Sequence, residues 1–305
     1  MTRARSHAVV VAAAAVVGGV LARSASAGPT NAPTPASALS AAAHDEADPE
    51  EPAGKGDNPY DEPGPARPPV AKIAVVQKDG MLRIPGGRFV MGTSSARAPR
   101  NERPAHAVVV APFWLDRTEV TVGAYRACVD AGACTRPART SATCTFDAGN
   151  AELPVSCVHW RDADAYCRHA GKRLPAESEW EYAARGPYRL PYPWGGAASC
   201  HEAVTLHVGQ SGQPCAPRPA PVGTHPGGAS VFGALDMAGN VAEWTADWYA
   251  ESIGSGPAPR AGAAHVLRGG SWLSPPTDAR TTSRDWGSAL EAGPDVGFRC
   301  ARNVE

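Results

Sequence analysis

The stretch GKRLPAESEWEYAARG, residues 171–186, predicts one short helix with a clear beginning and end. Pro175 suits the first turn of a helix, and Glu177 and Glu179 suit its positive amino-terminal end. Gly186 follows the last residue of the pattern, where glycine commonly ends a helix. The helix is therefore expected to begin at Pro175 and to end before Gly186.

The same stretch also has the composition of a catalytic cluster, because three acidic residues fall within five positions. Glu177, Glu179 and Glu181 stand at i, i+2 and i+4, however, so they cannot all share one face of a helix. We therefore interpret the acidic residues as architectural and expect Trp180 to pack into the core.

Short strands, a few helices and many turns are expected on both sides of this helix. LRIPGGRFVMGT (82–93) predicts a strand, a Gly-Gly turn and a second strand. Apolar residues recur at helical spacing over 121–132, with Thr121 as N-cap, and over 161–170. With 32 glycines and 30 prolines but no internal repeat, the patterned sequence is most simply one domain over residues 73–305.

The amino terminus has the composition of an export signal. Arg3 and Arg5 precede the 14-residue apolar run Ala8–Leu21, and small residues follow up to Ala27. The run is shorter than the roughly 20 residues that span a bilayer as a helix. We therefore expect a signal peptide over residues 1–27, cleaved after Ala27, rather than a retained membrane anchor.

Residues 28–72 are rich in proline, alanine and acidic residues and contain little to bury, so they are expected to form a disordered linker. The mature protein is then expected in the periplasm or outside the cell, with no membrane span. The net charge of the full chain, −1, gives no reason to expect nucleic acid as a partner.

Eight cysteines lie beyond residue 127, and an even number in an exported chain favours four disulfides over free thiols. No CxxC pair occurs and no histidine is grouped with the cysteines at zinc-ligand spacing, so a structural zinc site is not expected. The eight positions are Cys128, Cys134, Cys144, Cys157, Cys167, Cys200, Cys215 and Cys300.

Several blocks of this sequence occur in the order found in one known family. They are IPGGRFVMGT, ERPAHAVVVAPFWLDRTEVTVGAYRAC, LPVSCVHWRDADAYCRHAGKRLPAESEWEYAARG, YPWGG, GALDMAGNVAEWTADWY, VLRGGSWL and VGFRCAR. Over residues 80–303 the chain resembles the formylglycine-generating enzyme (sulfatase-modifying factor) family. The resemblance implies a single asymmetric α+β domain with low regular secondary structure and a C-type-lectin-like core. The family includes copper-dependent oxidases that convert a sulfatase cysteine to formylglycine.

The resemblance also shows where this chain departs from the oxidases. Their two copper-binding cysteines fall here on Ser274 and Ala279, after the turn RGGSWL (268–273). Copper(I) prefers soft thiolate ligands, which a hydroxyl and a methyl group cannot replace, so copper is not expected. A tryptophan common in the family's GNxWEW block is Ala242 here. Ser271 matches a residue that lines the family's substrate groove and is expected to keep that place.

Ser274 has two interpretations. It is either a polar residue in a loop before two prolines, which we favour, or a nucleophile activated by a nearby base. The histidines considered as that base are His159, His169 and His265.

DMAGNVAEW resembles a calcium loop of the family. Asp236 and Glu243 would supply carboxylates and Gly239 and Val241 backbone carbonyls, the hard oxygen ligands that calcium prefers. The alternative is a buried turn in which both carboxylates accept backbone N–H groups. The family's second calcium site would fall within residues 200–215 and is expected to be absent.

The family's oxidases have a disulfide that corresponds to Cys167–Cys300, and we expect it here. Cys128–Cys134, Cys144–Cys157 and Cys200–Cys215 are the remaining expected pairs. A different pairing among the first four cysteines stays open.

Two classes of function remain after these departures. The favoured one is an exported, non-oxidase binding or scaffold protein that uses the family groove for a peptide, an exported protein or a small ligand, with calcium as a structural ion. The alternative is a formylglycine-generating oxidase, or another protein-modifying enzyme, with an altered active site.

Overall fold

The computed structural model describes residues 71–305 except 139–140, 206–214 and 255–259. The predicted signal peptide and almost all of the predicted linker lie outside these residues. Lys72, the last residue assigned to the linker, already contacts the domain, because its Nζ donates to the carbonyls of Ala229 (2.7 Å) and Ser230 (3.0 Å). The part of the chain that the structure describes contains no helix long and apolar enough to cross a membrane.

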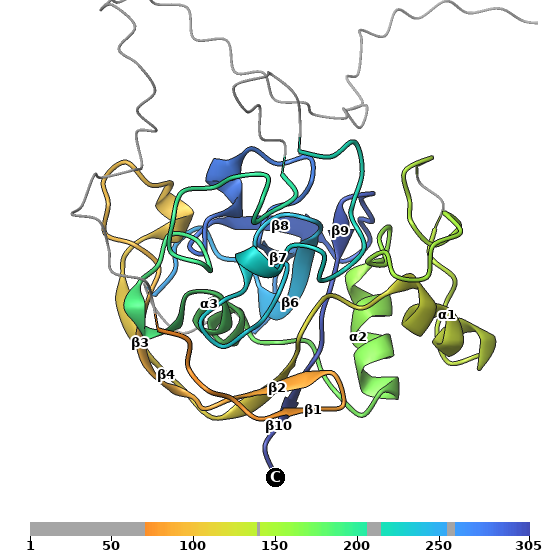
Figure 1. Ribbon diagram of the computed structural model, residues 1–305, viewed down its shortest axis with the longest axis horizontal. Helices are drawn as coiled ribbons and strands as arrows, with labels where there is room; N and C mark the ends of the chain where they lie inside the picture. Colours follow the sequence, from red (N-terminus) through yellow and green to blue (C-terminus); the bar gives the residue numbers. More distant parts are fainter. Residues whose placement is uncertain (1–70, 139–140, 206–214, 255–259) are drawn as a thin grey trace, which may run out of the picture. The chain divides into compact units, whose positions relative to one another are not determined.

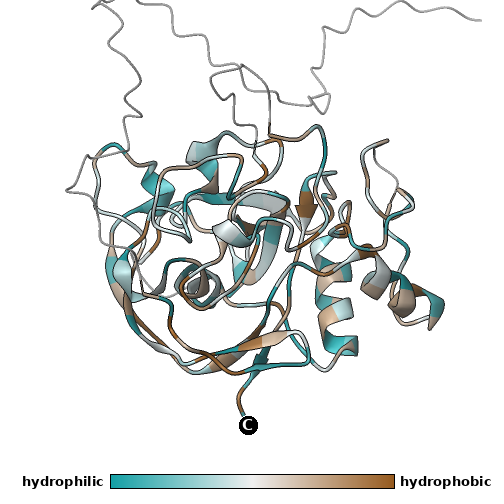
Figure 2. Cartoon of the chain, viewed as in Figure 1, coloured by the Kyte–Doolittle hydropathy of each residue, from teal (hydrophilic) through white to brown (hydrophobic). Residues whose placement is uncertain are grey.

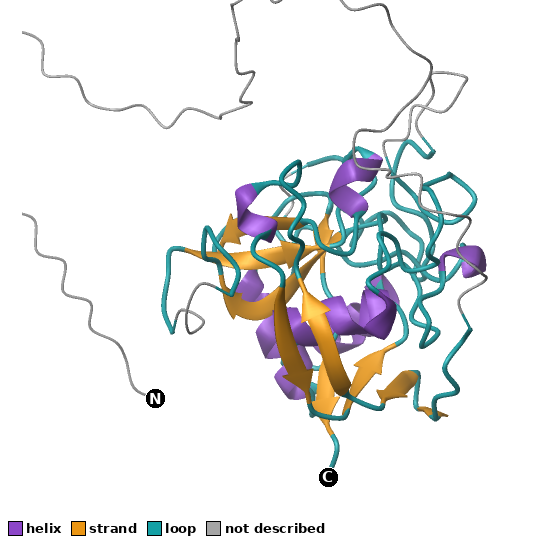
Figure 3. Ribbon diagram, turned by 90° about the vertical axis from the view of Figure 1, so that its left-hand side faces the viewer, coloured by secondary structure: helices purple, strands orange, loops and turns teal. Residues whose placement is uncertain are grey.

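The domain is of mixed α+β type, and much of the chain between its short elements is loop (Figure 3). The carboxyl-terminal strand lies within the first sheet, next to segments from the start of the domain (Figure 1). That antiparallel sheet has the order β1–β2–β5–β10, formed by β1 (Gln77–Lys78), β2 (Met81–Ile84), β5 (Phe113–Asp116) and β10 (Ala301–Asn303).

The two strands predicted within residues 82–93 both form, but they enter different sheets. The second of them, β3 (Gly87–Met91), pairs with β4 (His106–Val110) as a separate two-stranded sheet. The third sheet has the order β8–β7–β6–β9, in which β6 and β9 are parallel. Its strands are β6 (Ala242–Trp248), β7 (Ala264–Arg268), β8 (Arg284–Ser288) and β9 (Val296–Gly297).

The three predicted helices are present. Thr121 is the N-cap of the first, since its Oγ1 accepts the Ala124 N–H (3.2 Å). The third begins two residues later than predicted, because Ala176 stays extended as its N-cap and Glu179 accepts the Ala176 N–H (2.8 Å). The helices are α1 (Val122–Asp130), α2 (Trp160–His169) and α3 (Glu177–Arg185), with 3₁₀ turns η1 (Arg100–Glu102), η2 (Gly186–Tyr188), η3 (Pro226–Gly228) and η4 (Pro276–Ala279).

Two large apolar clusters form the core. One gathers around α3 and includes Trp180, which is completely buried as predicted. The other joins α1 and α2 to β6 and the segment before β10, and contains Tyr125 and Phe298. Each of α1 and α2 carries hydrophilic as well as hydrophobic residues, so one face can pack while the other meets solvent (Figure 2).

The four expected disulfides all form, which settles the pairing that the sequence left open. They are Cys128–Cys134, Cys144–Cys157, Cys167–Cys300 and Cys200–Cys215. Cys167 lies on α2 and Cys300 directly before β10, so this bond links the second core cluster to the carboxyl-terminal strand.

Breaking the Cys167–Cys300 bond is expected to cost the most stability of the four. The two cysteines are 133 positions apart, and in the chain-entropy model closing such a loop contributes about 4–5 kcal/mol. The double variant C167A/C300A should therefore lose about that much free energy of unfolding in urea. C128A/C134A, which opens a loop of separation 6, is the matched control and should lose clearly less.

An aromatic stack lies between α2 and the third sheet. The ring of His265 on β7 lies between Trp160 (centroid distance 3.8 Å) and Trp248 (3.9 Å). Its Nδ1 is 3.2 Å from the Asp247 carbonyl, whereas Nε2 is buried without a hydrogen-bond partner. Burial lowers the pKa of His265 from 6.5, although Asp247 and the charge of Asp164 oppose this shift.

The free energy of unfolding is therefore expected to fall in mild acid. Below about pH 6.5 the unfolded chain binds a proton at His265 that the folded chain does not, so stability is lost as pH falls from 6.5 toward the lower folded pKa. H265F, which keeps a ring in the stack, should lose less stability than the wild type between pH 7.5 and pH 5.5. Urea unfolding at both pH values measures this, and equal losses in the two proteins would contradict the assignment.

Candidate functional site

The turn after β7 is fixed by two glycines. Gly269 (φ +92°) and Gly270 (φ +62°) both have left-handed backbone conformations, which other residues adopt only with strain. A Cβ on Gly270 would lie 2.8 Å from the Asp278 carbonyl oxygen, and one on Gly269 would lie 3.1 Å from the Trp180 ring. The turn is therefore pressed against α3 on one side and η4 on the other.

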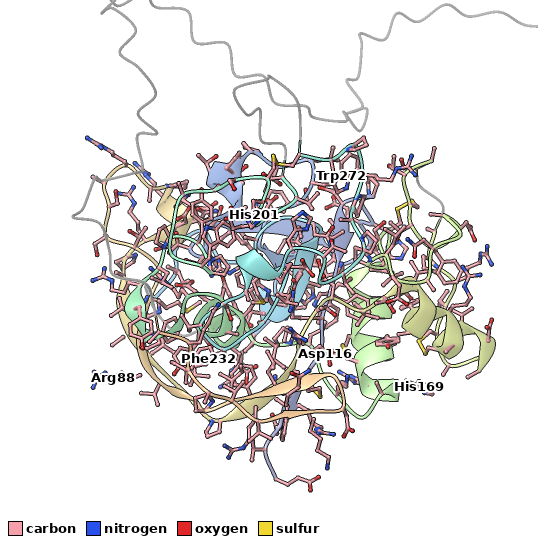
Figure 4. The ribbon with its side chains drawn as sticks, viewed as in Figure 1. Arg88, Asp116, His169, His201, Phe232 and Trp272 are labelled. Atoms are coloured by element: carbon pink, nitrogen blue, oxygen red, sulfur yellow. A yellow bond between two sulfur atoms is a disulfide. The ribbon has the colours of Figure 1, made fainter. Side chains whose placement is uncertain are left out.

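The turn also lies directly against the predicted calcium loop. The Gly239 N–H donates to the Gly269 carbonyl (2.8 Å), and the Trp272 N–H donates to the Asn240 carbonyl (2.9 Å). The structure thus brings together two segments that the sequence singled out separately. In Figure 4 Trp272 lies on the side of the domain away from Asp116 on β5, and so away from the first sheet.

Ser271 and Ser274 belong to one hydrogen-bond network. The buried Ser271 Oγ donates to Asp295 Oδ2 (2.9 Å) and lies 3.1 Å from the Ser274 Oγ. Ser274 Oγ also accepts the Ser271 backbone N–H (3.0 Å). Asp295 is held in place because its carbonyl accepts the Ala242 N–H (2.8 Å). The sequence analysis missed Asp295, whose only signal is its position two residues before the GFRC block.

The histidines considered as a base for Ser274 are engaged elsewhere. His159 Nδ1 contacts Asp162 (2.9 Å) at the start of α2, and His265 is held between two tryptophans. His169, the last residue of α2, lies far from Trp272 in Figure 4. Ser274 therefore contacts the Ser271 hydroxyl, which in turn bonds to the Asp295 carboxylate, as expected for a structured loop, and none of these three histidines is placed to activate it.

The position of the second copper-binding cysteine is occupied by Ala279, whose side chain is packed in the interior. Ala279, at the end of η4, is 1% exposed and packs with Tyr192 and Ala238. Ala242, at the tryptophan position, is the buried first residue of β6. The donor set at these positions is therefore one hydrogen-bonded hydroxyl, which does not fit the two-thiolate site of the oxidases.

All three acidic residues of α3 form ion pairs, and Glu181 links the helix to the turn. Glu181 pairs with Arg185 (2.8 Å) and with Arg268, the residue that leads into the turn. Glu177 pairs with Arg284 on β8 (2.5 Å). Glu179 pairs at the surface with Arg173. Each of the three acids thus has a cationic partner, which agrees with the architectural interpretation.

The predicted calcium loop agrees only in part with the alternative interpretation, because Asp236 accepts a backbone N–H whereas Glu243 accepts from side chains. Asp236 Oδ2 accepts the Gly223 N–H (2.6 Å). The buried Glu243 carboxylate accepts from Arg299 through both oxygens (2.7 Å each) and from Trp180 Nε1 (2.9 Å). Glu243 as arranged does not fit a calcium ligand, because its oxygens already face N–H donors. Calcium binding through Gly239, Val241 and these carboxylates stays a prediction.

A further carboxylate that the sequence analysis missed lies in this region. Glu119 is 2% exposed; its Oε1 accepts from Asn240 Nδ2 (3.0 Å), and its Oε2 is buried without a hydrogen-bond partner. Burial, with the nearby charge of Asp236, raises the pKa of Glu119 well above its ordinary value. The pKa of the Arg299 guanidinium is also raised: burial opposes its charge, but Glu243 outweighs that penalty and keeps Arg299 charged.

Comparison with known proteins gives a consistent result. The family model described as "Sulfatase-modifying factor enzyme 1-like domain" matches residues 67–304. A formylglycine-generating enzyme of Streptomyces coelicolor is 33% identical over 303 residues, covering 80% of this chain and 94% of that protein. A mouse protein named inactive C-alpha-formylglycine-generating enzyme 2 is 30% identical and covers 77% and 90%.

Among solved structures, PvdO from Pseudomonas aeruginosa superposes with a TM-score of 0.64 at 27% identity. The superposition covers 78% of this chain and all of PvdO. The relatives thus include one protein named as a formylglycine-generating enzyme and one named as inactive.

Removing the charge of Glu243 is expected to destabilise the domain strongly. E243Q leaves the buried Arg299 without its counter-ion, which costs about 3–5 kcal/mol when one partner of a buried pair is lost. E152Q, at an exposed site, should stay within about 0.5 kcal/mol of the wild type. Urea unfolding measures both.

A calcium titration in the same assay tests calcium binding by the loop. If the loop binds calcium, added calcium should raise the free energy of unfolding of the wild type but not that of D236N.

Proposed function

Because the chain belongs to the family of sulfatase-modifying factor enzyme 1-like domains, we propose that it is an exported binding protein. The surface around the turn at residues 268–274 holds its ligand, a peptide or a small molecule. The family contains members named as formylglycine-generating and as inactive, so family membership alone does not choose between catalysis and binding.

The observation that carries this proposal is the structure at the two positions of the copper-binding cysteines. The Ser274 hydroxyl is hydrogen-bonded to Ser271, which is bonded in turn to Asp295. The methyl group of Ala279 is packed against Tyr192. A soft Cu(I) ion requires thiolate ligands that these side chains do not provide. No step of the oxidase reaction is therefore assigned to this chain.

The same turn retains groups that suit recognition. The indole Nε1 of Trp272 is buried without a hydrogen-bond partner, and a buried N–H without an acceptor costs free energy that a ligand carbonyl could recover. Leu273 beside it is 43% exposed and offers apolar surface. These two features favour a ligand with a carbonyl or carboxylate group next to an apolar one, as a peptide has.

Export is supported by the disulfides and by the composition of the amino terminus. Four disulfides in one domain are typical of proteins that fold in an oxidising compartment. The segment that would carry the signal lies outside the described residues.

Metal and peptide assays test the proposal directly. Protein purified from an oxidising compartment should contain no stoichiometric copper, and a CxPxR peptide incubated with it, copper and oxygen should keep its cysteine in mass spectrometry. Conversion of that cysteine to an aldehyde would overturn the proposal in favour of an oxidase with an altered site.

Restoring both thiols supplies the matched gain-of-function variant. S274C/A279C should bind Cu(I) stoichiometrically in competition with a chromophoric Cu(I) chelator, whereas the wild type and S274C alone should not. Cu(I) binding by the wild type equal to that of the double variant would contradict the argument from the missing ligands.

A further inference from the structure

A hollow lies apart from the turn. Its volume is about 850 Å³, within the range of ligand pockets, and it is formed by the loop after β3 and the segment after β6. Tyr249 directly follows β6, whereas Gly269 directly follows β7. Because β6 and β7 are antiparallel, these two positions lie at opposite ends of the strand pair, so the hollow is a separate site.

Two arginines in the wall of the hollow have no counter-ion. Within the described part of the chain, neither Arg100 nor Arg103 has a carboxylate within 4.0 Å. The neighbouring Arg280 and Arg284, by contrast, are paired with acidic partners. The Nε of Arg103 is moreover buried with no hydrogen-bond acceptor, which is unusual for so strong a donor. This part of the wall is therefore positively charged, and the Arg103 Nε–H lacks a hydrogen-bond acceptor.

One acceptor in the wall of the hollow, the side-chain oxygen of Asn101, lacks a hydrogen-bond donor. The side chain of Asn101 donates through Nδ2 to the Arg284 carbonyl (3.1 Å), and its Oδ1 is buried with no donor in reach. Glu251, another wall residue, carries an exposed carboxylate that can accept further hydrogen bonds. A simple carboxylate ligand only accepts hydrogen bonds and would leave Asn101 unsatisfied. A ligand that fits must carry hydrogen-bond donors, as the hydroxyl groups of a sugar are, as well as a negative charge.

Aromatic surface lies at the same place. The Tyr249 ring lines the hollow and contacts Trp286, with 5.9 Å between ring centroids. Trp286 is 53% exposed, and the Arg284 guanidinium lies 5.1 Å from the centroid of the Tyr249 ring. The half-buried Tyr249 and the exposed Trp286 beside it offer apolar area for the C–H face of a sugar ring.

We propose that this hollow binds an acidic saccharide, a sugar chain that carries carboxylate groups. Arg100 and Arg103 bind the carboxylate, and hydroxyls donate to Asn101 Oδ1 and to Glu251. Tyr249, with Trp286 beside it, packs against a ring face. The proposal uses no residue of the turn and is independent of the function assigned to it.

Titration calorimetry with tetragalacturonate as the probe tests the site. We expect saturable binding in 0.15 M salt, where screening limits non-specific attraction, and affinity at least about tenfold lower for the neutral maltotetraose. R100Q/R103Q should weaken tetragalacturonate binding about tenfold or more, because two charge-assisted contacts are lost. The control is R88Q, which removes one charge from an exposed residue of β3 and should bind as the wild type does (Figure 4).

Several outcomes would overturn the proposal. They are an absence of saturable binding, equal affinity for the neutral tetrasaccharide, and equal weakening in R88Q and R100Q/R103Q. Displacement of tetragalacturonate by inorganic phosphate at the same concentration would show a simple anion site instead. S274A is expected to bind tetragalacturonate unchanged, so a failure here is distinguishable from a failure of the function proposed for the turn.

Discussion

The buried ion pair between Glu243 and Arg299 is the contact on which the rest of the domain depends. Both side chains are fully buried, and every N–H of the guanidinium has an acceptor. Two bonds go to Glu243 on β6; the others go to carbonyls at the end of β5 and in the loop before β6. A buried charge persists only when it is satisfied in this way, so the pair fixes the relative positions of three segments that are distant in sequence.

The geometry of the turn follows from that arrangement. Glu243 also accepts from the Trp180 indole, and the Trp180 ring in turn lies close to Gly269, 3.1 Å from where a Cβ would stand. Arg268 enters the turn already paired with α3. The segment that carries Ser271 and Ser274 is thus held by contacts to α3, and a site on such a support keeps its geometry.

The supports of the turn are separate from the two side chains at the positions of the copper-binding cysteines. The supports of the turn, namely its glycines, its ion pairs and the disulfide at Cys167–Cys300, do not depend on the two side chains that an oxidase needs. Replacing two thiols by a hydroxyl and a methyl group therefore removes ligands without removing architecture. The polar hollow at Arg100 and Arg103 is built from other segments, so the site proposed there does not depend on the turn.

The sequence by itself determined the family, the three helices, the burial of Trp180 and the absence of thiols at residues 274 and 279, because these rest on local pattern and residue identity. Only the tertiary structure decided which partner each polar group finds. Asp295 meets Ser271, Glu243 meets Arg299, and Asn101 lies beside Arg284, at separations of 24, 56 and 183 positions. Hydrogen bonds and ion pairs act over a few ångströms in space, and no local periodicity encodes which distant residues the fold will bring within that reach.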